Sequence, residues 1–144
     1  MAVLHFTSAL GRLTVTDSKG TYVVSATSGA GKCTNNSKCE GMNNIGPIPR
    51  GKYVVYRDDI NNPGMLHDIA RNYLYGDWGD WRVAIRSPAG SPMPVGRGGF
   101  YIHGGRFPGS AGCIDVGGGV LGDYLTDRVL KSLQEAEVSE LWVD

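Results

Sequence analysis

The sequence predicts a mainly β fold, a β-rich α+β arrangement with one or two helices. Of the 144 residues, 22 are glycine and 7 are proline, and only 19% are charged. Such a composition is typical of many turns and short strands rather than of a helical bundle. A chain of this length can bury one sizeable core, so we expect a single domain that spans residues 1–144.

Alternating and β-branched segments predict the strands in order along the chain. Segments 12–16 and 21–27 flank the turn sequence DSKG and predict an N-terminal hairpin. Residues 28–51 are dense in Gly, Asn, Ser and Pro and have no sustained period, which indicates a long ordered loop. Further strands are predicted at 52–57, 80–87, 100–103, 113–116 and 138–143. Within 80–87 the alternation places on one face Trp81, Val83 and Ile85.

Two segments have the spacing of amphipathic helices. Residues 62–76 begin with Asn-Pro and end with glycine, which predicts a short helix. Residues 121–137 carry a second apolar stripe. The residues expected on its buried face are Leu121, Leu125, Val129 and Leu133.

The charge balance argues against two kinds of partner. Lysine and arginine together number 14, as do aspartate and glutamate, so the formal net charge is zero. A neutral chain has no global attraction to nucleic acid or to an anionic membrane. No stretch approaches the roughly 20 apolar residues of a membrane span. The N-terminal segment lacks the basic and apolar regions of a secretory signal, so we expect synthesis in the cytoplasm without a signal peptide.

His103 and Cys113 lie ten residues apart in a segment rich in Gly, Pro and Ser. Strand alternation groups His103 with Tyr101, and Cys113 with Asp115. If the two strands pair as neighbours, the imidazole and the thiol lie at facing ends beside the connecting loop. An imidazolium in that position lowers the pKa of a thiol by several units and produces the thiolate that nucleophilic catalysis needs.

Glycines around this pair leave the backbone open to a substrate. The backbone amides of Gly112 and Cys113 can form an oxyanion hole, because they lie at the nucleophile itself.

Other interpretations of the same residues remain open. Cys113 can be a buried structural cysteine behind a glycine-rich hairpin, with His103 bound to a backbone carbonyl, because free cysteine is often buried. Zinc binding by these two residues with Cys33 and Cys39 is disfavoured by the C-x5-C spacing. Residues 117–122, GGGVLG, match a phosphate-binding glycine pattern, but too few residues follow to complete a βαβ unit. We therefore expect no metal and no cofactor.

The chain has three cysteines, so at least one remains unpaired. Cys33 and Cys39 can close a small disulfide loop in an oxidising space, or they can be two free thiols in a loop. The sequence leaves both states open.

The segments IHGG and SAGCI, around His103 and Cys113, resemble the active-site signature of the L,D-transpeptidase (YkuD-like) family. The segments SGAGKCTNN and GPIPRGKY resemble those of its Tlde1-like branch of type VI secretion effectors, the DUF2778 type. The resemblance runs from the N-terminal hairpin to Val116. It implies an L,D-transpeptidase-like β-sandwich or barrel with one or two helices.

The family's catalytic roles transfer to matching positions. The resemblance implies that Cys113 is the nucleophile and that His103 activates it. The backbone carbonyl of Gly104 then orients the imidazole ring.

The remaining motif positions agree only in part with the family. Ser110 and Gly112 match the Ser and Gly of its S-H-G-C motif, whereas Ala111 stands where the wider family has a second histidine. Asp115 stands where that family often has a basic residue. We expect Ser110, Gly112 and Asp115 to lie against the substrate, and Asp115 is also a candidate to orient the imidazole.

Further substrate contacts are expected from Tyr101 and from loop arginines. A guanidinium suits bidentate capture of a carboxylate, and peptidoglycan stems carry several carboxylates. Arg50, Arg97 and Arg106 are the candidates, and Arg106 is favoured because it lies between the histidine and the cysteine.

The resemblance implies a peptidoglycan-modifying enzyme. It would cleave the L,D bond before the terminal D-alanine of tetrapeptide stems as an L,D-carboxypeptidase, or exchange that residue for another D-amino acid. It also implies an antibacterial effector that acts in the periplasm of target bacteria, with a secretion-system component and a cognate immunity protein as partners. The alternatives are a non-catalytic cell-wall-binding domain and another cysteine peptidase or amidase.

Overall fold

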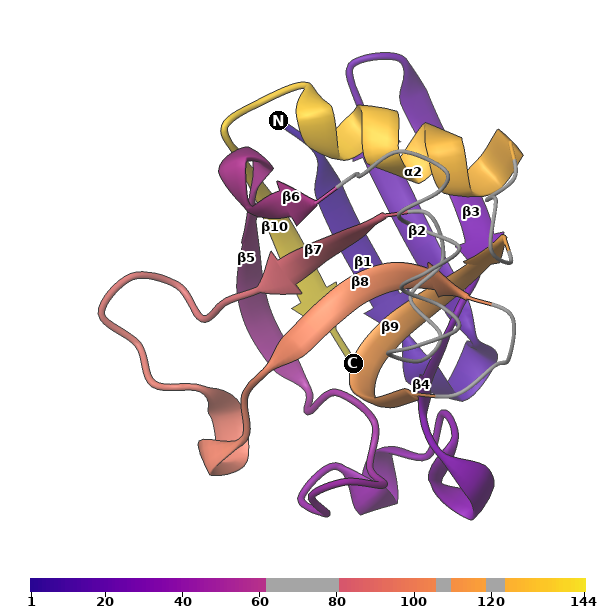
Figure 1. Ribbon diagram of the computed structural model, residues 1–144, viewed down its shortest axis with the longest axis vertical. Coiled ribbons are helices and arrows are strands. Elements are labelled where there is room, and N and C mark those ends of the chain that lie inside the picture. Colours follow the sequence, from indigo (N-terminus) through magenta and orange to yellow (C-terminus); the bar gives the residue numbers. More distant parts are fainter. Residues whose placement is uncertain (62–80, 106–109, 119–123) are drawn as a thin grey trace.

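The computed structural model describes residues 1–61, 81–105, 110–118 and 124–144. Within these ranges, ten strands form two five-stranded sheets, and one α-helix lies across one end of the sheets (Figure 1). The first sheet contains, in spatial order, β3 (Gly20–Ser25), β2 (Arg12–Asp17), β1 (Val3–Thr7), β10 (Val138–Val143) and β5 (Gly51–Tyr56). The second contains β4 (Thr27–Gly29), β9 (Ser110–Gly118), β8 (Phe100–Gly105), β7 (Arg82–Ile85) and β6 (Ile60–Asn61). The predicted mainly β fold class is confirmed.

The N-terminal strands confirm one prediction and add a strand that was not predicted. β2 and β3 form the expected antiparallel hairpin. β1 lies between β2 and β10 and pairs with β10 in parallel, so the two ends of the chain lie side by side. The alternation that marks β1 covers only a few residues, with Leu4 and Phe6 buried and Val3 and His5 exposed.

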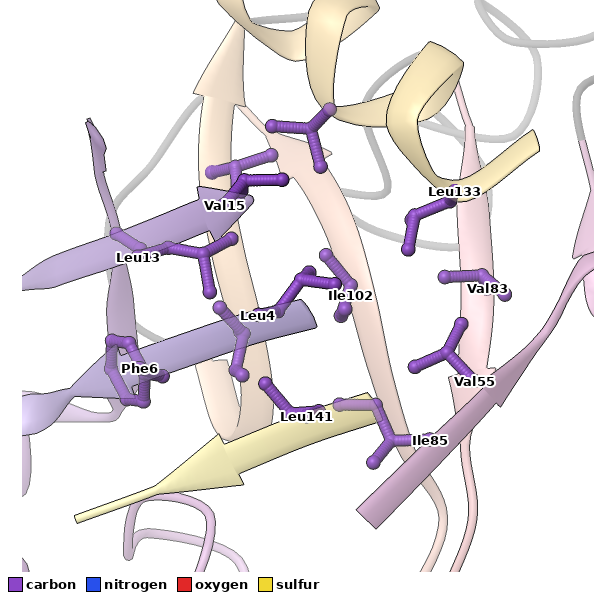
Figure 2. Close-up of a cluster of buried hydrophobic side chains, with 14 of the residues drawn as sticks. Leu4, Phe6, Leu13, Val15, Val55, Val83, Ile85, Ile102, Leu133 and Leu141 are labelled. Atoms are coloured by element: carbon purple, nitrogen blue, oxygen red, sulfur yellow. The ribbon is translucent and has the colours of Figure 1, made fainter. Parts of the chain in front are cut away.

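Side chains from the inner faces of both sheets build one hydrophobic core (Figure 2). The predicted buried face of segment 80–87 is confirmed, because Trp81, Val83 and Ile85 all belong to this core. Around them Figure 2 labels Leu4, Phe6, Leu13, Val15, Val55, Ile102, Leu133 and Leu141.

The two sheets are linked along one edge. The Val54 N–H donates to the Arg86 carbonyl at 2.8 Å, and the Arg86 N–H donates back to the Val54 carbonyl at 2.9 Å. This bridge joins β5 to the residue that follows β7. The sandwich is therefore partly closed, as expected of a fold between sandwich and barrel.

Helix α2 (Tyr124–Gln134) confirms the second predicted helix but not its whole buried face. Leu125 is 43% exposed, so its placement in the core was wrong, whereas Leu133 is 1% exposed. On a helix of 3.6 residues per turn, a residue four positions further along is rotated by about 40° around the helix axis. Leu125 and Leu133 are two such steps apart, so they lie on different faces of the helix. The buried apolar residues are Val129, Leu130 and Leu133. Leu121 and the predicted helix 62–76 lie outside the described residues.

No described helix is long and apolar enough to span a membrane.

The two leucines of α2 provide a matched stability test. Leu133→Ala should lower the free energy of unfolding by about 2–5 kcal/mol, because it opens a cavity between α2 and the sheets. Leu125→Ala should change it by less than about 1 kcal/mol, because that side chain is already partly in water. Urea denaturation followed by circular dichroism measures both. Equal losses for the two variants would contradict the assigned helix face.

Candidate active site

Strands β8 and β9 carry the predicted reactive residues and pair as neighbours, as expected. Their pairing is parallel, with Ile102 opposite Ile114 and His103 opposite Asp115. The interpretation of this segment as a hairpin is therefore wrong. The physical reason is that the first residue of β9, Ser110, pairs with Gly29 of β4 rather than folding back on β8.

The parallel register brings His103 and Cys113 together on the face that points away from the core. Ile102 and Ile114 enter the core, so the alternate residues of both strands share the opposite face. His103 lies opposite Asp115, and Cys113 is two residues before Asp115 on the same strand face. Cys113 is therefore the diagonal neighbour of His103. Both side chains are buried, at 2% exposure for His103 and 7% for Cys113, and a hydrogen bond joins them.

The imidazole is held in a defined orientation. The Nδ1–H of His103 donates to the Gly104 carbonyl at 2.7 Å, as the resemblance implied. Nε2 is then the ring nitrogen left for the Cys113 thiol. The imidazole thus contacts the thiol with one ring nitrogen, while the Gly104 carbonyl holds the other and fixes the orientation of the ring. This is the geometry of an activated cysteine nucleophile.

The surroundings of His103 favour its charged form. Burial alone lowers the pKa of the imidazolium, because desolvation penalises charge. The hydrogen bonds to Cys113 and to the Gly104 carbonyl act in the opposite direction, as do the negative charges of Cys113 and Asp115. The net effect raises the pKa of His103 above its ordinary value. An imidazolium favoured in this way can stabilise a neighbouring thiolate.

The structural-cysteine interpretation accounts for only part of this geometry. It explains the burial of Cys113 and the carbonyl partner of His103. It does not require the hydrogen bond between the two side chains, which is the feature that nucleophilic chemistry needs.

The backbone just before Cys113 is fixed by a distant loop. Gly112 has a φ of 77°, and its N–H donates to the Gly46 carbonyl at 2.9 Å. That amide is therefore engaged, and its predicted role in an oxyanion hole is not supported. A Cβ at position 112 would overlap the ring of Phe100, so only glycine fits here without a shift.

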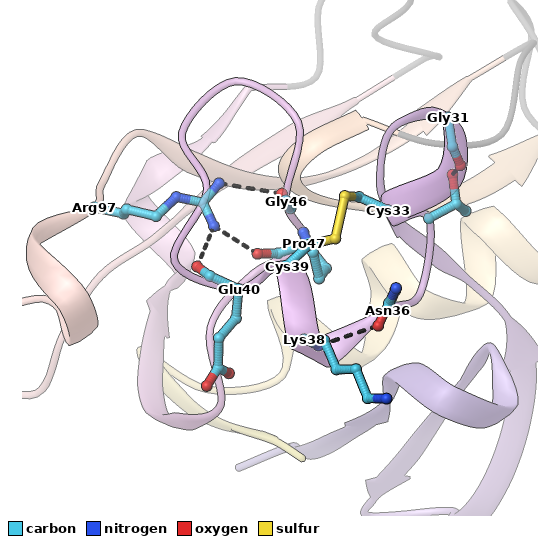
Figure 3. Close-up of a disulfide and its surroundings, with 10 residues drawn as sticks. Gly31, Cys33, Asn36, Lys38, Cys39, Glu40, Gly46, Pro47 and Arg97 are labelled. Carbon is cyan, nitrogen blue, oxygen red and sulfur yellow. Dashed lines mark hydrogen bonds between the residues drawn. A yellow bond between two sulfur atoms is a disulfide. The ribbon is translucent and has the colours of Figure 1, made fainter.

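Arg97 holds the same loop and is not a surface residue (Figure 3). It is 6% exposed, and its Nη1 donates to the carbonyls of Glu40 and Pro47, each at 2.7 Å. Its Nη2 donates to the Gly46 carbonyl at 3.1 Å, the same oxygen that accepts from Gly112. The guanidinium thus positions the loop against the nucleophile's strand, and its predicted substrate role was wrong.

A disulfide closes the loop that Arg97 binds. Cys33 and Cys39 are bonded in the structure, which decides between the two states that the sequence left open (Figure 3). Because these two sulfurs are bonded to each other, they cannot join His103 and Cys113 as zinc ligands. Among the described residues, no group of three or more His, Cys, Asp or Glu side chains could hold a metal ion.

The remaining predicted site residues have different placements. Asp115 is buried directly opposite His103, and its Oδ1 accepts the Gly117 N–H at 2.8 Å. It acts on the imidazole through its charge, whereas the carbonyl of Gly104 provides the orienting bond. Tyr101 lies two residues before His103 on the same strand face.

Among the predicted arginines, Arg50 forms a bidentate ion pair with Glu40. Its Nε and Nη2 donate to the two carboxylate oxygens at 3.0 and 2.8 Å. Arg106 lies outside the described residues. Arg82 was not predicted as a site residue, although it pairs with His103 across β7 and β8. The alternation of segment 80–87 could have indicated it, because Val83 and Ile85 are buried and Arg82 therefore lies on the face away from the core.

The fold of this chain is similar to that of L,D-transpeptidases of known structure. L,D-transpeptidase 1 from Mycobacterium tuberculosis aligns with a TM-score of 0.51 and 12% identity, over 99% of this chain and 62% of that one. An L,D-transpeptidase from Mycobacterium smegmatis aligns with a TM-score of 0.48 and 14% identity, over 99% and 58%. This chain thus spans about three fifths of their length.

The model of the Tlde1 domain family matches residues 23–135, and the chain belongs to this family. No curated protein gives a significant match to the sequence. The matched segment contains β8, β9 and the whole of α2.

The packing of Gly112 can be tested against a matched glycine. Gly112→Ala should lower the free energy of unfolding by about 2–4 kcal/mol, because a left-handed backbone and an overlap with Phe100 both oppose the methyl group. Gly99 has a similar φ of 75°, but its Cβ would meet nothing within 4 Å. Gly99→Ala should therefore show only the smaller backbone cost in the same denaturation experiment. Similar losses for both variants would show that the contact with Phe100 is unimportant.

The pKa of His103 predicts how alkylation of Cys113 depends on pH. Because that pKa is raised, the imidazolium should keep Cys113 reactive toward iodoacetamide at pH 6, where ordinary thiols near pKa 8.5 are protonated. Intact-protein mass spectrometry should show one adduct, since the other two cysteines form a disulfide.

His103→Gln should slow alkylation at pH 6 by about tenfold or more, because the cationic partner is lost. His5→Gln is the control, since His5 pairs with Asp144 at 3.0 Å in another part of the molecule. Equal alkylation rates for wild type and His103→Gln would contradict a thiolate–imidazolium pair.

Proposed function

We propose that the protein is a cysteine enzyme that modifies peptidoglycan at the L,D bond before the terminal D-alanine of tetrapeptide stems. The observation that carries this proposal is the hydrogen bond between Cys113 and an imidazole whose other nitrogen is held by the Gly104 carbonyl. Membership of the Tlde1 domain family and the similarity in fold to L,D-transpeptidases support this choice of substrate.

In the first half of the reaction, the Cys113 thiolate attacks the carbonyl carbon at the L-centre of diaminopimelate. The carbonyl electron pair moves to oxygen, and the Cys113 amide is the proposed donor to that oxyanion. When the intermediate collapses, the C–N bond to D-alanine breaks, and the His103 imidazolium gives its proton to the leaving nitrogen. The products are free D-alanine and a thioester on Cys113.

In the second half, the now neutral His103 removes a proton from the attacking group. Attack by water releases the tripeptide stem, which is L,D-carboxypeptidase activity. Attack by the amino group of a D-amino acid forms a new amide, which is exchange. In both cases the thioester C–S bond breaks, and the thiolate and imidazolium are restored.

We also propose that residues 1–144 form one catalytic domain that acts as an antibacterial type VI secretion effector in the periplasm of target bacteria. The Cys33–Cys39 disulfide fits an oxidising compartment. The pairing of β1 with β10 fits a single domain. A secretion-system component and a cognate immunity protein are the partners that this role requires.

The chemistry is tested with purified disaccharide-tetrapeptide and D-methionine, followed by mass spectrometry. Wild-type protein should release D-alanine and yield the tripeptide, the D-methionine product, or both. Cys113→Ala should form no product, because no thioester can form. His103→Gln should reduce the rate by at least about 100-fold, because the general acid and base are lost.

His5→Gln is the matched histidine control and should retain full activity, since His5 lies on β1 in the other sheet. Product formation by Cys113→Ala at the wild-type rate would refute the nucleophile. No product from a folded wild-type protein would favour a non-catalytic wall-binding domain or another scissile bond.

A further inference from the structure

A row of polar residues crosses the whole second sheet through His103. Direct strand partners link Asn61 to Arg82, Arg82 to His103, and His103 to Asp115. The last partner, Thr27 of β4, lies opposite Asp115. Residues directly opposite one another share a sheet face, so all five belong to the face of the reactive pair.

Two groups of opposite charge therefore flank His103. Arg82 occupies the neighbouring position on β7, and Asp115 occupies it on β9. Opposite residues of neighbouring strands have Cα atoms about 5 Å apart, so a long arginine side chain on β7 reaches the surroundings of the imidazole. A negatively charged substrate group beside His103 is attracted toward β7 and repelled from β9.

The contact of Arg82 with Tyr101 shows where its guanidinium lies. The Cζ atom of Arg82 is 5.3 Å from the centre of the Tyr101 ring. Both side chains are half-buried, and Tyr101 shares the strand face of His103. A guanidinium that lies over an aromatic ring uses its π face for the ring, whereas the N–H groups along its edge suit bidentate binding of a carboxylate.

Arg82 lies next to the reactive pair and on its face, directly opposite His103. Arg86, whose guanidinium binds Asp59, is a second arginine close to the same strand and serves as its control.

We propose that Arg82 binds a carboxylate of the stem peptide and so determines which way the substrate lies across Cys113 and His103. This inference rests on the proposed function, because it assumes a stem peptide in the site. Two carboxylates can fill the role, that of the terminal D-alanine and that on the side chain of diaminopimelate. In either case the carboxylate lies on the β7 side of His103, away from Asp115.

The test compares Arg82→Gln, Arg82→Lys and the control Arg86→Gln on three substrates: the tetrapeptide, its terminal carboxamide and a tetrapeptide with amidated diaminopimelate. Arg82→Gln should raise KM for the tetrapeptide by roughly 10- to 100-fold with little change in kcat, because a charge-assisted bidentate contact is lost from both ground and transition states. Arg82→Lys should be intermediate, since a point charge replaces the fork. Arg86→Gln should leave KM unchanged, because Arg86 is bound to Asp59 at 2.7 and 3.1 Å.

The amidated substrates show which carboxylate is bound. The effect of Arg82→Gln should disappear on the substrate that lacks the carboxylate recognised by Arg82. If the effect has the same size on all three substrates, or is absent from all three, the proposal is overturned.

Binding measured on the Cys113→Ala protein separates this inference from the proposed reaction. Calorimetry with the tetrapeptide should show weaker binding when Arg82→Gln is added, and this difference should be lost with the matching amide. If wild type shows no turnover but the binding difference is present, the reaction is refuted and the role of Arg82 stands. If turnover is present and Arg82→Gln changes neither KM nor binding, the role of Arg82 alone is refuted. If the tetrapeptide does not bind, both are refuted.

Discussion

The parallel register of β8 and β9 determines what surrounds Cys113. Because Ile102 lies opposite Ile114 and both enter the core, the other face of these strands receives His103, Cys113 and Asp115. A shift of one residue in either strand would exchange its two faces and turn an isoleucine out of the core. The apolar pairing that stabilises the sandwich therefore also fixes the reactive pair.

The backbone ahead of the nucleophile depends on a second, polar constraint. One carbonyl oxygen, that of Gly46, accepts from both the Gly112 N–H and the Arg97 guanidinium. Burial lowers the pKa of Arg97, but an arginine side chain still remains protonated, so its charge needs these carbonyl partners. The Cys33–Cys39 disulfide closes the same loop upstream. The position of Cys113 thus depends on contacts far away in the sequence.

Local patterns predicted much of the fold, and long-range contacts account for what they missed. Alternation identified β2, β3, β5, β7 and β10, because one face of each is buried. It could not reveal that β9 starts beside β4, since the sequence TSG carries no period. The same limit applies to the arginines. The sequence does not show that Arg97 is buried, so Arg97 was predicted to bind substrate. It also does not show that β7 lies beside β8, and only that pairing places Arg82 opposite His103.

Arg82 and Asp115 flank His103 with opposite charges. Asp115 is buried, where a low effective dielectric strengthens its attraction to the imidazolium, whereas Arg82 is half-buried. The charge of Asp115 helps to raise the pKa of His103, together with the hydrogen bonds to Cys113 and to the Gly104 carbonyl. Under the proposed role of Arg82, a stem carboxylate lies on the side of His103 opposite Asp115. The substrate then approaches an imidazole whose charged form the protein itself already favours, so binding and activation depend on different sides of the same histidine.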